Sequence, residues 1–376
     1  LIYIIFKIMK FKKYLQRLFK KVFQKLFFVL YGKIHNLKKL PQNKFIKYNL
    51  DCIKLDAGNF TLDNNIHKII NGRVYTDTVE HVAIIKDNIL LHDISYQQID
   101  GELKNSEFNK VLVTGTPRLI KKINGTVLSL VQGVSGENYF HFLFDIITKL
   151  KMCEQVITLD KIDFFYVSGN IEWQDKIFSL FDIKKNQLIN SKIHRHISAP
   201  KLIALDHPWY HSGYVQNEVA NLPEWIIFWL RERFIPLSKK FDCNNKIFID
   251  RSDSKFEHCQ FQNNDEIIKF LSTKGFTSYK ISELDFLEQI YLFSNAKTII
   301  GPHGAAFSNI VFCNPTANII EILPETHNSK KCERLSSVLR LNYTKIFTPK
   351  VNTNKKRFGE INFDINKMRQ IIEKII

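Results

Sequence analysis

The alternation of hydrophobic and polar positions changes its period along this chain, and residues 11–27 show the clearest helical pattern. Apolar side chains recur there every three or four residues, while the other positions carry basic or amide groups. This spacing predicts an amphipathic helix. The apolar positions are Phe11, Tyr14, Leu15, Leu18, Phe19, Val22, Phe23, Leu26 and Phe27.

Charge is distributed as unevenly as hydropathy. The formal net charge is +17, and residues 1–50 hold thirteen of the 54 Lys and Arg residues and no Asp or Glu. Because the rest of the chain is only mildly basic, we expect no nucleic-acid partner. An apolar face opposite a basic face favours binding of residues 10–30 to an anionic membrane surface. The alternative is a helix that docks on the protein body through its apolar stripe.

The first residues do not fit a membrane span or a secretion signal. The apolar run Leu1–Phe6 is followed by Lys7 and Lys10, well short of the ~20 apolar residues that a span needs. A signal peptide carries its charges before its apolar run. The six cysteines show no disulfide or zinc spacing. We therefore expect a cytoplasmic protein, peripheral to the inner face of the plasma membrane.

The remaining pattern predicts an α/β fold with two domains. Short strands separated by turns occupy the region up to residue 122, including predicted strands at 82–85, 89–91 and 111–114. Strands then alternate with helices, most regularly in the second half. We expect a basic helix and linker (1–50), an N-terminal α/β domain (51–236), a C-terminal Rossmann-like domain (237–350) and a helical tail (351–376).

The strongest chemical signal is the segment 296–312. An apolar strand ends at Gly301, and a loop through His303 and Gly304 leads to Ala305 and a predicted helix. Glycines let the backbone turn sharply and approach a ligand closely. The N–H groups in the first turn of a helix favour an anion, and His303 can donate to a phosphate or contact a sugar hydroxyl.

Two further residues complete this predicted site. Asn309 lies on the helix after the loop, and Glu321 ends the next predicted strand, where a carboxylate suits a ribose diol. The alternative is that the glycines serve only a tight turn and that His303 is an ordinary loop residue.

A second group of residues lies on a predicted helix, 137–153, that follows a strand and a glycine break. Asn138, His141 and Asp145 share one face of this helix, and the last two are one turn apart. A carboxylate one turn from an imidazole orients the ring and raises its basicity, which suits a general base. A routine contact between neighbouring side chains is the alternative.

The segment Asp250–Asp253 directly follows the predicted strand 246–249, and its Arg251 can bind a diphosphate through two hydrogen bonds. A surface ion pair with Asp250 or Asp253 is the alternative. The chain contains no Asp-x-Asp, no Gly-Lys-Ser/Thr, no His-Glu-x-x-His and no Gly-x-Ser-x-Gly. These absences argue against a metal-bound sugar nucleotide, nucleotide hydrolysis, zinc proteolysis and serine hydrolysis, so we expect neither a metal nor another cofactor.

Taken together, residues 125–325 resemble glycosyltransferase family 61, the capsular polysaccharide biosynthesis type. The resemblance lies in the order and spacing of Asn138–Asp145, Lys246–Asp253 and Phe286–Ile322. It implies a GT-B architecture, in which two Rossmann-like domains face each other across a cleft. It also implies metal-independent, inverting transfer from a nucleotide sugar to a glycan or lipid-linked acceptor. The stretch 255–265 departs from the family pattern, which carries a second Arg there.

The resemblance assigns roles to the residues identified above. Arg251, His303, Gly304 and Ala305 would contact the donor, whereas His141 and Asp145 would face the acceptor, and either can be the base. The competing functions are pyruvyl transfer in polysaccharide assembly and a membrane-bound scaffold that binds glycans without turnover.

Overall fold

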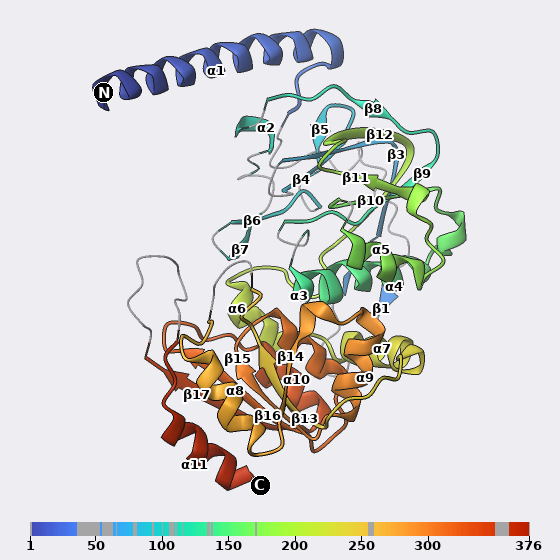
Figure 1. Cartoon of the computed structure of the whole chain (residues 1–376). Helices are drawn as coiled ribbons and strands as arrows, with labels where there is room; N and C mark the ends of the chain where they lie inside the picture. Colours follow the sequence, from blue (N-terminus) through green and yellow to red (C-terminus); the bar gives the residue numbers. More distant parts are fainter. Residues whose placement is uncertain are drawn as a thin grey trace. The chain divides into compact units, whose positions relative to one another are not determined.

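Figure 1 shows the computed structural model of the chain. Its described residues divide into two compact units, unit 1 ending at Ser212 and unit 2 beginning at Gly213. This boundary precedes the expected one at 236/237, because Arg231 donates to the carbonyls of Val311 (2.7 Å) and Cys313 (2.6 Å) in unit 2. The described residues are 2–35, 53–54, 63–64, 66–77, 81–91, 94–99, 101–104, 109, 111–114, 116–133, 136, 138–169, 171–254, 259–349 and 361–375.

Helix α1 (Ile2–Tyr31) includes the whole predicted helical segment. Gly32 follows it with a left-handed φ of 80°, and its N–H donates to the carbonyl of Phe28 at 3.0 Å, which is the usual way for a glycine to end a helix. Within the described part of the chain, no helix combines the length and the apolar character that crossing a membrane requires. Residues 36–50, which belong to the helix and linker expected over 1–50, lie outside the described residues.

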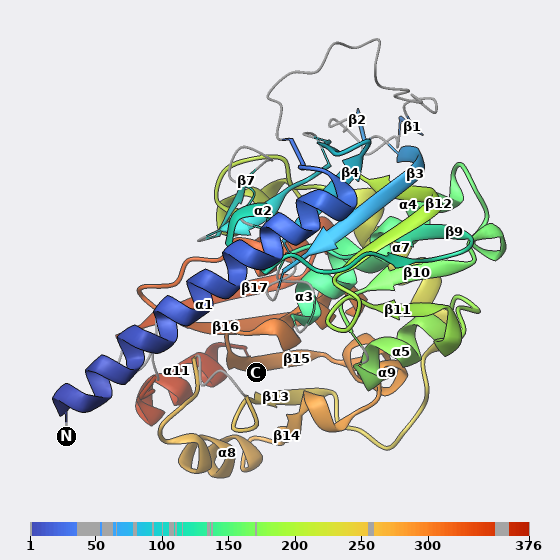
Figure 2. The ribbon, with the colours of Figure 1, turned by 90° about the horizontal axis from the view of Figure 1, so that it is seen from above.

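Unit 1 is built on a mixed sheet with the strand order β11-β10-β9-β12-β3-β4-β5, and β8 pairs with β12. β9, β10, β11 and β12 run parallel, whereas β3, β4 and β5 continue the sheet antiparallel; Figure 2 shows β9, β12 and β3 side by side. The bounds are β3 (Ile66–Thr76), β4 (Val82–Lys86), β5 (Ile89–Leu90), β8 (Lys121–Lys122), β9 (Thr126–Ser129), β10 (Phe164–Val167), β11 (Leu188–Asn190) and β12 (His196–Leu205). Two further antiparallel pairs join β1 (Ile53–Lys54) to β2 (Asp63–Asn64) and β6 (Gln97–Ile99) to β7 (Glu102–Lys104).

The helices of unit 1 follow the predicted rhythm with one clear exception. The segment expected as a strand at 111–114 is the helical turn α2 (Val111–Thr114), because the side-chain oxygen of Asn109 accepts from the Val111 N–H at 3.1 Å and starts the turn. The others are α3 (Tyr139–His141), η3 (Phe142–Ile147), α4 (Thr148–Glu154), η4 (Leu159–Lys161), α5 (Glu172–Ser179) and η5 (Lys185–Gln187).

Unit 2 contains a parallel sheet with the strand order β14-β13-β15-β16-β17. Its strands are β13 (Lys246–Asp250), β14 (Thr277–Lys280), β15 (Thr298–Pro302), β16 (Asn318–Pro324) and β17 (Asn342–Thr348). Its helices are α6 (Val215–Glu218), η6 (Val219–Asn221), α7 (Glu224–Phe234), η7 (Ile235–Leu237), α8 (Asn264–Ser272), η8 (Ile281–Glu283), α9 (Phe286–Asn295), η9 (Ala305–Phe312), α10 (Lys331–Leu339) and α11 (Ile365–Ile375). The tail helix α11 belongs to this unit, since Met368 and Ile372 are buried in the same core as Phe248.

Strand order locates a ligand-binding edge in each unit. In open α/β sheets, ligands bind at the carboxyl ends of the strands where the strand order reverses. That reversal lies between β9 and β12 in the parallel part of the unit 1 sheet, and between β13 and β15 in unit 2. The residues that follow these four strands are therefore the first candidates for a site.

Candidate active site

In unit 1, the helix after β9 carries two of the predicted residues. Asn138 caps α3, since its side-chain oxygen accepts from the backbone N–H groups of Phe140 (3.0 Å) and His141 (3.4 Å). The chain then passes through the π turn η3, which contains Asp145, before α4 continues the helix. Single π turns inside helices are rare and occur frequently at functional sites. Asn138 thus serves the start of the helix that presents His141.

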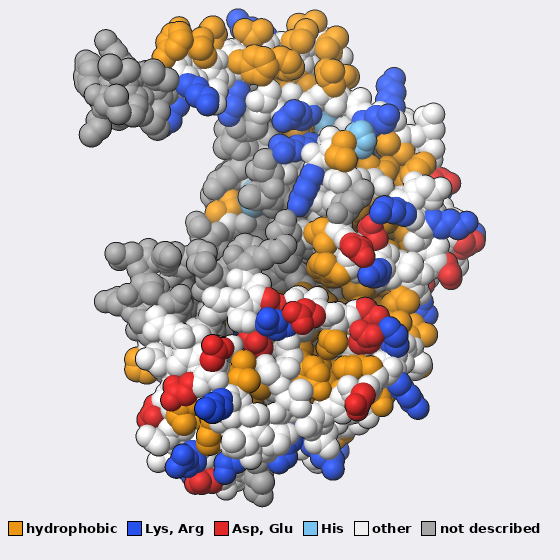
Figure 3. Space-filling view, viewed as in Figure 1, with side chains coloured by type: hydrophobic (Ala, Val, Ile, Leu, Met, Phe, Trp, Pro, Cys, Tyr) orange, Lys and Arg blue, Asp and Glu red, His pale blue; other side chains and the backbone are white. Residues whose placement is uncertain are grey.

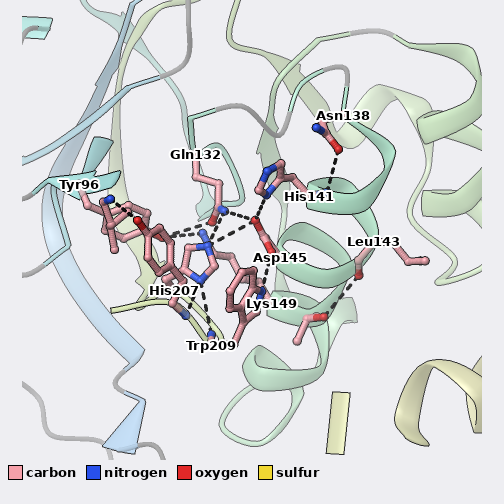
Figure 4. Close-up of polar contacts among 12 residues, drawn as sticks. Tyr96, Gln132, Asn138, His141, Leu143, Asp145, Lys149, His207 and Trp209 are labelled. Atoms are coloured by element: carbon pink, nitrogen blue, oxygen red, sulfur yellow. Dashed lines mark hydrogen bonds and ion pairs between the residues drawn. The ribbon is translucent and has the colours of Figure 1, made fainter. Parts of the chain in front are cut away.

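Asp145 is fully buried, and hydrogen-bond donors surround both of its carboxylate oxygens (Figure 4). Oδ1 accepts from Trp209 Nε1 at 2.7 Å. Oδ2 lies 2.8 Å from His141 Nδ1 and accepts from Gln132 Nε2 at 2.9 Å. His207 Nε2 lies 3.3 Å from the same oxygen. We call these five residues the His141 cluster.

The partners of the two imidazoles indicate which nitrogen of each ring carries the proton. His207 Nδ1 accepts from the backbone N–H groups of Trp209 (3.4 Å) and Tyr210 (3.0 Å), so its proton is on Nε2 and points at Asp145. His141 presents Nδ1 to Asp145, so that nitrogen holds the proton and Nε2 is left as the proton acceptor. The arrangement is that of a general base oriented by a buried carboxylate.

Electrostatics separate the roles of His141 and Asp145. Burial raises the pKa of the Asp145 carboxyl, but the charges of His207 and His141 and their hydrogen bonds outweigh it and hold the pKa well below its usual value. A carboxylate that is ionised, enclosed and fully hydrogen-bonded is a poor proton acceptor. The side chain of His141 keeps 9% of its surface exposed, whereas that of Asp145 has none. Of these two side chains, His141 is therefore the better placed to accept a proton, while Asp145 holds its ring.

A buried lysine lies on the next turn of the same helix. Lys149 Nζ donates to Tyr96 Oη at 2.9 Å, and Tyr96 Oη donates to Gln132 Oε1 at 3.4 Å. Burial lowers the pKa of Lys149 to about 7, even though the charges of Asp145 and Asp206 raise it. This chain of polar groups connects Lys149 to the His141 cluster.

The sequence predicted the pairing of His141 with Asp145, and the structure brings these two residues together. It did not predict Gln132, His207 or Trp209. A signal for two of them exists, since Gln132 comes just after β9 and His207 just after β12. Polar residues that follow adjacent parallel strands meet at one edge of the sheet.

In unit 2, the predicted donor residues meet where the strand order reverses. Arg251 follows β13, and His303 and Gly304 follow β15, which includes Gly301. A Cβ atom added to Gly304 would overlap the guanidinium of Arg251, and one added to Gly301 would come within 2.9 Å of Ile249 Cβ. Gly304 has an extended backbone with φ 176°. Both glycines are therefore explained by close packing against β13 and its following residue, rather than by a sharp turn.

Glu321 has a different position from the one expected for a ribose ligand. It is fully buried; its Oε1 bonds to His303 Nδ1 and accepts from Cys332 Sγ (3.1 Å), and its Oε2 accepts from Tyr343 Oη (2.5 Å). Burial raises its pKa, but the charge of His303 outweighs this effect and lowers the pKa to about 2. This packing makes Glu321 a partner that orients His303.

The pairing with Glu321 determines what His303 can do. Nδ1 holds the proton toward Glu321, so Nε2 of the neutral ring is an acceptor. Burial lowers the pKa of His303, although Glu321 raises it, so the neutral form is favoured. An accepting Nε2 suits a hydroxyl of a sugar better than a phosphate oxygen.

Two basic side chains that the sequence did not single out also lie at this loop. Lys331 Nζ donates to the Gly304 carbonyl at 2.9 Å, and the His327 ring lies 4.4 Å from that of His303. Burial lowers the pKa of Lys331 and that of Arg251. We call Arg251, His303, Gly304, Glu321 and Lys331 the His303 cluster. Charged groups held in a low dielectric attract an anion strongly.

The helix predicted after the loop is η9. Residues 305–312 form a 3₁₀ helix, which begins at Ala305. Asn309 is buried, and its Nδ2 donates to Gln289 Oε1 at 2.9 Å, so its side chain packs η9 against α9. Among the described residues, no three His, Cys, Asp or Glu side chains are arranged to hold a metal ion.

Comparison with known proteins adds one independent result. A search of curated proteins finds no match. The model of one protein family matches residues 139–320, a segment that includes His141, Asp145, Arg251 and His303. That family is Glycosyltransferase 61, and the match supports a glycosyltransferase of this family.

Proposed function

We propose that the chain is an inverting, metal-independent glycosyltransferase that uses a nucleotide-sugar donor. The acceptor is a glycan of the cell surface or capsule, free or lipid-linked. The observation that carries the donor assignment is the contact of Arg251 with Gly304, with Lys331 bonded to the same glycine. Two cations fixed at one loop can hold a diphosphate and stabilise the charge that develops on it.

His141 is the proposed base in unit 1, because Asp145 fixes its Nδ1 and leaves Nε2 to accept a proton. The acceptor hydroxyl gives its proton to Nε2, and its oxygen attacks the anomeric carbon. The bond from that carbon to the diphosphate breaks, and its electron pair leaves with the nucleoside diphosphate. Attack from the side opposite the leaving group inverts the anomeric configuration.

In this proposal, Arg251 and Lys331 stabilise the negative charge that develops on the diphosphate as it leaves. They are preorganised donors that act in place of a metal ion. His303 Nε2 accepts from a hydroxyl of the donor. In this proposal unit 1 supplies the base and unit 2 supplies the donor contacts, in keeping with the GT-B architecture that the family resemblance implies.

The test is a calorimetric titration of the purified chain with uridine, cytidine and guanosine diphosphates and their sugars, with phosphoenolpyruvate as the comparison donor. We expect one nucleotide sugar to bind and Arg251→Gln to weaken it about 100-fold or more, at ~3 kcal/mol for a lost charged donor. Arg369→Gln, at an exposed arginine on α11, is the matched control and leaves affinity unchanged. Binding of phosphoenolpyruvate alone, or of none of these compounds, would overturn the proposal.

A further inference from the structure

Helix α1 displays an apolar face that the described residues of the rest of the chain do not cover. Nine of its large apolar side chains are exposed by 46% or more, and Figure 3 shows hydrophobic side chains gathered along the helix. They are Phe11, Tyr14, Leu15, Leu18, Phe19, Val22, Leu26, Val29 and Leu30. The sequence left open that this helix docks on the protein body through its apolar stripe. The described residues do not show such docking, because most of the stripe is exposed.

The carboxyl-terminal end of α1 packs against unit 1. Phe27 is buried there, with its ring stacked 5.7 Å from that of His196. A few residues on, the His35 N–H donates to the Asn88 carbonyl at 2.8 Å, and the His35 carbonyl accepts from the Leu90 N–H at 3.0 Å. These contacts fix the end of the helix, while residues 10–22 extend away from them and are all exposed.

The charges of α1 indicate what covers this face. The first 50 residues contain no acid, and the polar positions of α1 are basic or amide groups. Contiguous exposed apolar surface of this kind marks an interaction site. A bilayer with anionic headgroups satisfies both faces, because the acyl boundary takes the aromatic and leucine side chains while the headgroups attract the lysines.

We propose that α1 lies in the surface of an anionic lipid bilayer, with its apolar face toward the acyl chains and unit 1 held next to the membrane through Phe27. This places the transferase where lipid-linked or surface glycans are assembled. Membrane binding does not depend on the proposed sugar transfer, since α1 lies outside the residues assigned to it.

The test is flotation of the full chain with vesicles of phosphatidylcholine alone or with phosphatidylglycerol added. We expect binding that requires phosphatidylglycerol and weakens as salt rises. Lys13→Gln with Lys20→Gln lowers the partition constant by about fivefold per lysine, at ~1 kcal/mol each. Phe19→Ser lowers it about tenfold through lost apolar burial.

Matched controls separate these effects from general changes in charge and hydropathy. Phe228 on α7 is about as exposed as Phe19 (50% and 55%), so Phe228→Ser should leave flotation unchanged. Lys269→Gln with Lys297→Gln, at exposed positions of unit 2, should do the same. Equal binding to both vesicles, or wild-type flotation of the α1 variants, overturns the proposal. So does a concentration-dependent dimer that Phe19→Ser dissociates in a chain that does not float.

Discussion

The guanidinium of Arg251 lies where a side chain at residue 304 would have to go. The two residues come from different strands, Arg251 after β13 and Gly304 after β15, and these strands are neighbours in the sheet. Because glycine has no Cβ atom, the cation can rest directly against the loop backbone. Packing in unit 2 thus sets the position of the charge that we assign to the donor diphosphate.

Gly304→Ala tests this relationship. The added methyl group displaces Arg251, so we expect nucleoside diphosphate affinity to fall about tenfold or more, measured by calorimetry, with a small change in melting temperature. In an Arg251→Gln background, the same substitution should have almost no further effect, because residues that act through one contact are not additive. Additive losses of affinity in the double variant would show that Gly304 acts independently of Arg251.

Asp145→Asn should lower kcat by about 10²–10⁴ with little change in donor affinity, since the amide no longer holds His141 in its basic tautomer. His141→Ala should have a similar effect. Both are measured as initial rates of nucleoside diphosphate release, after thermal melting has shown that the variant is folded.

Trp209→Phe is the graded control for the same cluster. It removes the hydrogen bond to Asp145 Oδ1 and keeps the aromatic packing, so we expect a loss of about tenfold or less in kcat. Full activity of Asp145→Asn would contradict the assignment of His141 as an oriented base.

His303→Ala should weaken binding of the nucleotide sugar more than binding of the nucleoside diphosphate alone, because the neutral ring accepts from a sugar hydroxyl. We expect about a tenfold loss of affinity for the sugar nucleotide by calorimetry, at ~1–1.5 kcal/mol for one hydrogen bond. Asn309→Ser is the comparison. Its side chain bonds to Gln289, so we expect lower stability and unchanged donor affinity.

Stability should fall as the pH drops below about 6.5, the usual value for an unfolded histidine. Burial lowers the pKa of His196 to about 3, so between these values the unfolded chain binds a proton that the folded chain does not. The slope contributed is ~1.4 kcal/mol per pH unit. His196→Phe keeps the stacking on Tyr75 and Phe27 and should flatten the urea-midpoint profile between pH 6.5 and 5. An unchanged slope would exclude His196 as its source.

Local spacing determined a large part of what the sequence predicted. A helical period is set by neighbours in the chain, so α1 and the one-turn separation of His141 and Asp145 could be inferred directly. The alternation of strands and helices in unit 2 follows from the same kind of pattern. The family match likewise covers residues that the sequence had already singled out.

Only the tertiary structure decided which distant residues share a site. Strand order brings Gln132 and His207 to Asp145. The same packing buries Glu321, whose carboxylate bonds to His303 instead of reaching a ligand. Such contacts join residues far apart in the chain, and local periodicity carries no information about them. The same limit applies to α1. Its pattern predicted an apolar face, but only packing determined that this face stays exposed. All nine predicted apolar positions are described, and of these nine only Phe27 is buried.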